Sequence, residues 1–116
     1  MNYFWMGNDG ERRPRAMLLT PKEIDRLTVY TLAELARKRQ ARGLKLNHPE
    51  ATAIICDEIF EEARAGRSYE EVVAHATSIL TRADVMDGVA EMLGSLQVDA
   101  MFPDGTRLVT VRNPIQ

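Results

Sequence analysis

The sequence predicts an α+β fold, with three main helices and a short fourth, followed by a C-terminal antiparallel β-hairpin. Two observations support this prediction. Thr20 and Ser68 each precede a glutamate by three positions and an apolar run at helical spacing, which is typical of helix N-termini. The segment 96–111 instead alternates apolar and polar residues on either side of a Pro-Asp-Gly turn, as paired strands do. With 116 residues, 45% apolar and 28% charged, the chain suits one globular domain.

We divide the chain into an N-terminal extension, residues 1–16, and one domain, residues 17–116. The extension contains no apolar stretch long enough for a signal-peptide core, and we expect it to pack little. The single Cys56 excludes an internal disulfide framework. No run of about 18 apolar residues is present to span a membrane. We therefore expect a cytoplasmic protein that does not bind membranes.

The first helix is predicted from Pro21 to about Gln40, because Thr20 and Glu23 form a capping box and Gly43 marks the end. Its apolar side chains cover roughly 200° of the circumference at 100° per residue. Residues that this projection places opposite the apolar arc are Arg26, Tyr30, Arg37 and Lys38. An arc this wide predicts contacts with two separate bodies.

The second helix is predicted from His48 to Ala65, with Asn47 as its cap and Gly66 beyond its end. Within it, Cys56 shares a row with an aromatic side chain. We interpret this thiol as a small buried hydrophobe rather than a reactive group.

Ser68 opens a third helix, whose apolar residues continue at helical spacing to Leu80. The segment 81–84 offers a start for a short fourth helix that reaches Leu93 and ends near Gly94. The hairpin follows, with Pro103 and Gly105 in its turn. Because a two-stranded ribbon is marginal in water and leaves both edges unpaired, we expect it to lie on a partner subunit.

The residues do not predict a catalytic, cofactor-binding or metal-binding site on this chain. A zinc or nickel site needs several converging ligands, and the chain has only His48, His75 and one thiol. No serine lies in a glycine elbow, so no hydrolytic triad can be assembled. Glutamates around residues 58–71 are read as solvated or as favourable to helix N-termini.

A basic segment, residues 37–45, carries five cations and offers an alternative interpretation. Residues 1–45 hold ten Lys and Arg against five Asp and Glu, so the charge of the chain is unevenly distributed. The alternative function is a small basic-helix regulator that binds nucleic acid from Arg37 to Lys45. The segment contains no aromatic residue for base stacking, and the helix after it is acidic, which favours a function without nucleic acid.

Several blocks of the chain, taken in order, resemble the bacterial urease gamma subunit family, from Met17 to Ile115. The blocks are Leu19-Thr-Pro-Lys-Glu23, Glu34-Leu-Ala-Arg-Lys-Arg-Gln-Ala-Arg-Gly-Leu-Lys-Leu-Asn-His-Pro-Glu-Ala51, Leu80-Thr-Arg-Ala-Asp-Val-Met-Asp-Gly-Val89 and Phe102-Pro-Asp-Gly-Thr-Arg-Leu-Val-Thr-Val111. The resemblance implies a noncatalytic, structural subunit of a hydrolase that converts urea to ammonia and carbamate in urea catabolism and nitrogen metabolism.

The same resemblance implies alpha and beta subunits as partners in a three-fold hetero-oligomer in the cytoplasm. It places the nickel centre on the alpha subunit, with no cofactor on this chain. Because the chain stops shortly after the hairpin, we expect a separate beta polypeptide. For the partner interface we predict polar and ribbon residues, namely Arg37, Arg39, Arg42, Val98, Phe102, Leu108 and Val111.

Overall fold

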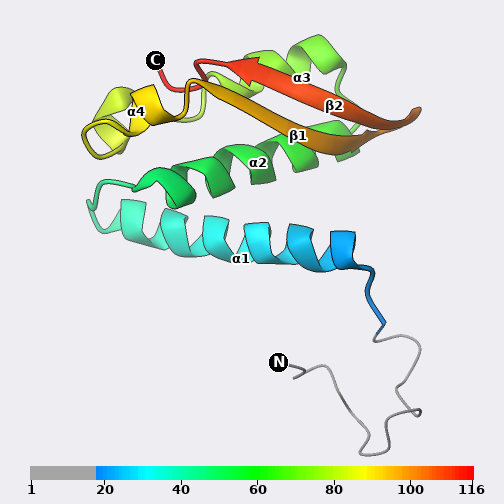
Figure 1. The fold of residues 1–116 in the computed structure, drawn as a ribbon, viewed down its shortest axis with the longest axis horizontal. Helices are drawn as coiled ribbons and strands as arrows, with labels where there is room; N and C mark the ends of the chain where they lie inside the picture. Colours follow the sequence, from blue (N-terminus) through cyan, green and yellow to red (C-terminus); the bar gives the residue numbers. More distant parts are fainter. Residues whose placement is uncertain (1–17) are drawn as a thin grey trace, which may run out of the picture.

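The computed structural model describes residues 18–116 and confirms the α+β fold (Figure 1). The predicted extension, residues 1–16, lies outside the described residues. The elements in chain order are α1 (Pro21–Ala41), α2 (His48–Arg64), α3 (Tyr69–Ala76), α4 (Val89–Met92), β1 (Ser95–Phe102) and β2 (Gly105–Arg112). Figure 1 shows α1 below α2, with the hairpin and α3 above α2, so α2 is the middle of three layers.

Each of the three main helices begins with a capping box. The side chains of Thr20, Asn47 and Ser68 accept a hydrogen bond from the backbone N–H three residues on, and the glutamate there accepts one in return. Past the ends of the first two helices, Gly43 has φ of 83° and Gly66 has φ of 95°. Residues other than glycine rarely adopt a positive φ, so glycine suits both helix ends. The first two helices therefore lie where the sequence predicts them.

The third helix ends earlier than predicted, at Ala76 rather than Leu80. The hydroxyls of Thr77 and Ser78 donate to the carbonyls of Ala74 and His75 and occupy acceptors of the last turn. The chain then continues as a turn, although the Leu80 side chain is still buried. The helical spacing predicted the buried residue but not the conformation of its backbone.

The predicted fourth helix is wrong in its first half. Residues Arg82–Asp84 form a 3₁₀ turn, and Val85 is then extended and forms a parallel bridge with Leu46. The Met86 N–H donates to the Leu46 carbonyl at 2.8 Å, which holds the segment out of a helix. Within the segment predicted as the fourth helix, only α4, four residues long, is α-helical. A contact with a distant part of the chain overrides the local spacing here.

The hairpin is antiparallel, as predicted, and pairs Leu96 with Val111 and Val98 with Val109. One face of the ribbon lies on the chain itself, since β1 contacts α2 and β2 contacts α3. The expectation that the ribbon needs a partner subunit beneath it is therefore wrong for this face. Alternation along β1 buries Leu96, Ala100 and Phe102 toward the helices.

Large aliphatic side chains fill the space between α2, α3 and the hairpin. Those with almost no exposed surface include Leu46, Ile55, Ile59, Val72, Val109, Val111 and Ile115. The contribution of α1 differs, because its only buried residues are Ala33 and Ala36. The main core thus lies on the hairpin side of α2, and α1 packs on the other side through these alanines and the half-buried Val29 and Leu32.

Candidate partner interface

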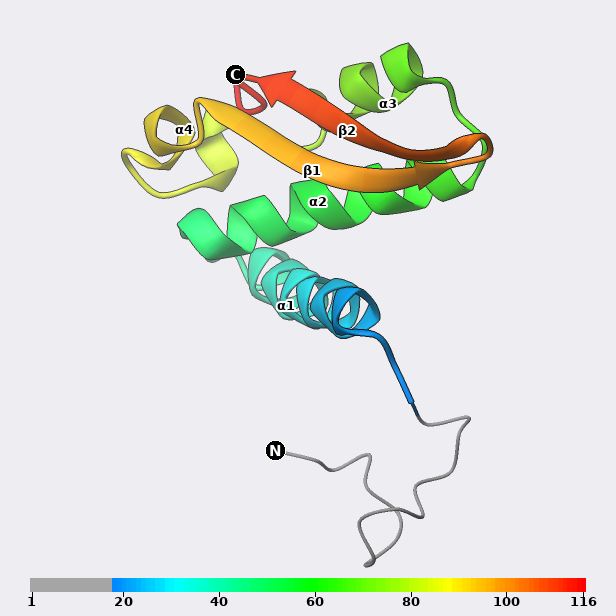
Figure 2. The same ribbon diagram turned by 45° about the vertical axis from the view of Figure 1, so that its right-hand side comes forward.

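The outer face of α1 carries apolar side chains with no described element over them. Ile24, Leu27, Tyr30 and Leu35 are each between 40% and 50% exposed. At 100° per residue, Ile24 and Leu27 lie about 120–180° around the helix from Ala33 and Ala36, which contact α2. Figure 2 views α1 nearly along its axis and shows α2 on one side of it. We call Ile24, Leu27, Tyr30 and Leu35 the outer face of α1.

Two arginines that the helical projection places opposite the apolar arc reach α2 with their long side chains. The Arg26 guanidinium carbon lies 5.6 Å from the centre of the Phe60 ring, within reach of a cation–π contact. Arg37 forms ion pairs with Asp57 and Glu58 of α2. Because arginine has a long side chain, a cation on the flank of α1 can reach across to α2.

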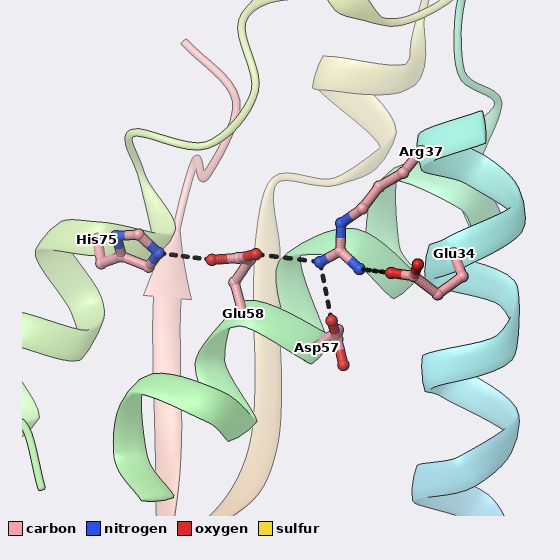
Figure 3. A network of polar contacts seen from close by, with 5 residues as sticks. All are labelled: Glu34, Arg37, Asp57, Glu58 and His75. Atoms are coloured by element: carbon pink, nitrogen blue, oxygen red, sulfur yellow. Dashed lines mark hydrogen bonds and ion pairs between the residues drawn. The ribbon is translucent and has the colours of Figure 1, made fainter. Parts of the chain in front are cut away.

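Arg37 is the centre of a polar network that joins three helices (Figure 3). Its Nη2 donates to Asp57 Oδ2 at 2.8 Å and to Glu58 Oε2 at 3.0 Å, while Nη1 contacts Glu34 of α1. Glu58 also contacts α3, where His75 Nε2 lies 2.8 Å from Glu58 Oε1. Burial works to lower the pKa of Arg37, but the bonds to Asp57 and Glu34 raise it above its usual value. The network therefore stabilises the packing of α1 on α2.

The basic segment, residues 37–45, is largely bound to the chain itself. Arg39 forms an ion pair with the buried Glu50, and Lys45 Nζ donates to the Ala83 carbonyl at 2.7 Å. A hydrogen bond from the Asn47 N–H, together with Arg39, lowers the pKa of Glu50 despite its burial. With Arg37 also paired, three of the five cations have partners within the fold, and nothing supports the nucleic-acid alternative.

The predicted interface residues fall into two groups in the structure. Arg37 and Arg39 are paired, Phe102 and Val111 are buried, and Val98 is half-buried. Arg42 and Leu108 are exposed. Whether any of these residues contacts a partner stays a prediction. The list omitted the outer face of α1, although the wide apolar arc contains three of its residues, Ile24, Leu27 and Leu35.

Among residues 18–116 no group of three or more His, Cys, Asp or Glu is placed to hold a metal ion. His48 lies in the first turn of α2 and His75 contacts Glu58. Burial, with a smaller effect of Asp57, raises the pKa of the Cys56 thiol to about 11, so the thiolate nucleophile is suppressed. None of the described helices is long and apolar enough to cross a bilayer.

Comparison with known proteins places the chain in one family. The model of the family described as urease, gamma subunit, matches residues 17–115. The urease subunit gamma proteins of Laribacter hongkongensis and Edwardsiella ictaluri are 55% and 57% identical over 100 residues, which are 86% of this chain and all of each relative. A urease subunit gamma/beta of Pseudomonas syringae pv. syringae is 59% identical over the same share of the chain, which spans 43% of that relative's length.

Proposed function

The chain belongs to the urease gamma subunit family, and on this premise we propose that it is a noncatalytic, structural subunit of a urease, which hydrolyses urea to ammonia and carbamate. The observation that carries the proposal is the outer face of α1. A helix with four large, half-exposed apolar side chains on its free side is unusual for a chain that functions alone. Covering this face on assembly would remove that apolar surface from water.

A nickel centre does not fit the described residues of this chain. Nickel in proteins takes imidazole and carboxylate ligands, and the two histidines lie on different helices, one at a helix start and one against Glu58. We therefore propose that the nickel of the complex is held by the alpha subunit, and that this chain contributes no group to the reaction. Its role is to stabilise the assembly that holds the centre.

We further propose alpha and beta subunits as the partners, in a three-fold hetero-oligomer in the cytoplasm. The outer face of α1 is the main apolar contact, and the exposed Arg42 and Leu108 extend the interface. These residues combine an apolar centre with a cation, a composition common at protein interfaces. The two separate regions, on α1 and on β2, allow contacts with more than one neighbour.

The test is coexpression of the full chain with the alpha and beta subunits of the same organism, followed by size-exclusion chromatography with mass detection and urea hydrolysis assays on each peak. We expect activity in a large peak that contains this chain, and no activity from the chain alone with nickel. Recovery of the chain only as a small species, with activity in a peak that lacks it, would contradict the proposal.

A further inference from the structure

A cation lies over a pair of aromatic rings near the tip of the hairpin, away from α1. The Arg107 guanidinium carbon is 5.1 Å from the centre of the Tyr69 ring and 5.3 Å from that of the Phe102 ring. The two rings lie 6.2 Å apart at an interplanar angle of 28°. The cation thus interacts with both rings at once, within the range of cation–π attraction.

The register of the hairpin places Arg107 on the face of the ribbon that points to the helices. It is opposite Ala100, which is fully buried, and two residues before the buried Val109. Side chains alternate along a strand, so Arg107 and Val109 point the same way. Near the tip this face opens to solvent, and Arg107 is exposed there. The arginine is therefore an inward-facing cation at the open end of the ribbon.

The two rings under Arg107 are held firmly. Phe102 is 4% exposed, and the Tyr69 hydroxyl accepts a hydrogen bond from the Thr110 N–H at 3.2 Å, which ties the start of α3 to β2. A side chain that rests on fixed rings has fewer conformations to lose when it binds. The contacts with both rings thus favour one position of the Arg107 side chain before a partner binds.

The donors of Arg107 have no acceptor in the part of the chain that is described. Within residues 18–116 it makes no side-chain hydrogen bond and no ion pair, although Glu70 and Asp104 lie nearby at the same pocket. That pocket, about 510 Å³, lies between the tip of the hairpin and the start of α3. Arg67, also at its wall, is paired with Glu62 at 3.5 Å. Among the described residues that line this pocket, Arg107 is thus the cation without an ion-pair partner.

We propose that this pocket is a docking site for a carboxylate side chain of a partner urease subunit, with Arg107 as its anchor. A guanidinium presents a planar fork of N–H groups that matches a carboxylate, and the aromatic faces beneath it cannot accept these bonds. Arginine and tyrosine held in a pocket are also the residues that dominate binding energy at interfaces. This inference rests on the proposed function and assigns one specific polar contact to it.

The test uses the full chain coexpressed with the alpha and beta subunits, with two variants and one matched control. Arg107→Met keeps an unbranched stem over the rings and removes the donors, so we expect folding to be unchanged and association to weaken by at least about tenfold. Arg112→Met makes the same change at an exposed position on the same strand, and we expect association as in the wild type. Circular dichroism and thermal unfolding check the fold of each variant.

The second variant, Arg107→Lys, identifies the acceptor. Carbodiimide joins amines to carboxylates in direct contact, so the amine introduced at position 107 should crosslink to an Asp or Glu of the alpha or beta subunit, and mass spectrometry would locate the link. Crosslinks only to Asp104 or Glu70 of the same chain would overturn the inference, as would unchanged association of Arg107→Met. Failure of the wild-type chain itself to assemble with the other subunits would contradict the proposed function, and with it the inference that rests on it.

Discussion

The two sides of α2 are packed in opposite ways. Toward the hairpin, α2 buries large aliphatic side chains such as Ile55 and Ile59, which have no exposed surface. Toward α1, the buried contacts are Ala33 and Ala36, and ion pairs of Arg37 and Arg39 lie around them. The hairpin side buries large side chains completely, whereas the α1 side buries small ones, with the half-buried Val29 and Leu32 beside them and polar bonds at the border.

This difference explains where the large apolar residues of α1 lie. The α1 residues that pack on the core are Ala33 and Ala36 with the half-buried Val29 and Leu32, whereas Ile24 and Leu27 lie on the other side of the helix and remain exposed. Burial of large side chains stabilises a fold far more than alanine contacts do. We infer that the hairpin side sets the stability of the chain, and that the outer face of α1 serves assembly.

The largest expected effect is on the hairpin side. Replacing Ile59 by Ala removes buried methyl groups and leaves a cavity beneath the hairpin, so the free energy of unfolding should fall by about 2–5 kcal/mol. Guanidinium unfolding of the purified chain, followed by circular dichroism, measures the change. A loss below about 1 kcal/mol would mean that this side is not a complete core.

The next effect concerns the polar border of α1. Replacing Arg37 by Met leaves the carboxylate of Asp57, a residue that is 6% exposed, without its cation. The free energy of unfolding should therefore fall by about 2 kcal/mol. The exposed Arg42, changed to Met, is the control and should shift stability by less than about 0.5 kcal/mol.

The double variant with Arg37→Met and Asp57→Asn sharpens this test. Because the second change removes the buried charge, it should restore part of the lost stability, and a double-mutant cycle gives the coupling between the two residues. Strictly additive losses would show that the pair makes no specific contribution.

Substitutions on the outer face of α1 should weaken association with the partner subunits but leave the stability of the chain alone nearly unchanged. Replacing Ile24 and Leu27 together by Ala keeps good helix formers at exposed positions, so the stability of the chain alone should change by less than about 0.5 kcal/mol. Association with the alpha and beta subunits should weaken by about tenfold, since apolar surface is lost from the contact. Lys38→Ala, an exposed change on the same helix, is the control for sedimentation or mass-detected chromatography.

The smallest effect is a pH dependence at the start of α2. The Asn47 N–H and Arg39 lower the pKa of Glu50 from 4.5, so its contribution is complete above that value and is lost as the pH falls through the folded pKa. Between pH 5 and pH 3 the wild type should lose more stability than Glu50→Gln, which has no carboxylate to protonate at this position. Parallel stability curves for the two proteins over this range would contradict the assignment.

Local sequence signals predicted the parts of the fold that depend on neighbouring residues. The capping boxes at Thr20 and Ser68 fixed two helix starts, because their hydrogen bonds join residues only three apart. The turn at Pro103 likewise predicted the hairpin. The bridge between Leu46 and Val85 was missed, since its partners are far apart in sequence and neither carries a local signal for it.

For the candidate sites too, the sequence predicted properties of a single element but not contacts between elements. The sequence showed that α1 has an apolar arc too wide for one neighbour, which is a property of one helix and needs no knowledge of the rest. It could not show which part of the arc meets α2, or that the side chains of Arg26 and Arg37 reach α2. The contact of Arg107 with Tyr69 and Phe102 was also beyond it, because this contact joins β2 to α3 and β1.

By itself, the sequence determined the fold class, the starts of the three main helices, the hairpin and the family, all of which rest on short-range patterns or on the order of whole blocks. Only the tertiary structure decided that the hairpin lies on its own chain, that Ala33 and Ala36 face α2, and that Ile24 and Leu27 remain exposed. The physical reason is that two faces of one helix can be similarly hydrophobic but differ in shape. Their fit to the neighbouring elements then determines which face is buried. Ala33 and Ala36 are buried in the contact between α1 and α2, and Arg37 and Arg39 pair with carboxylates of α2 at its border.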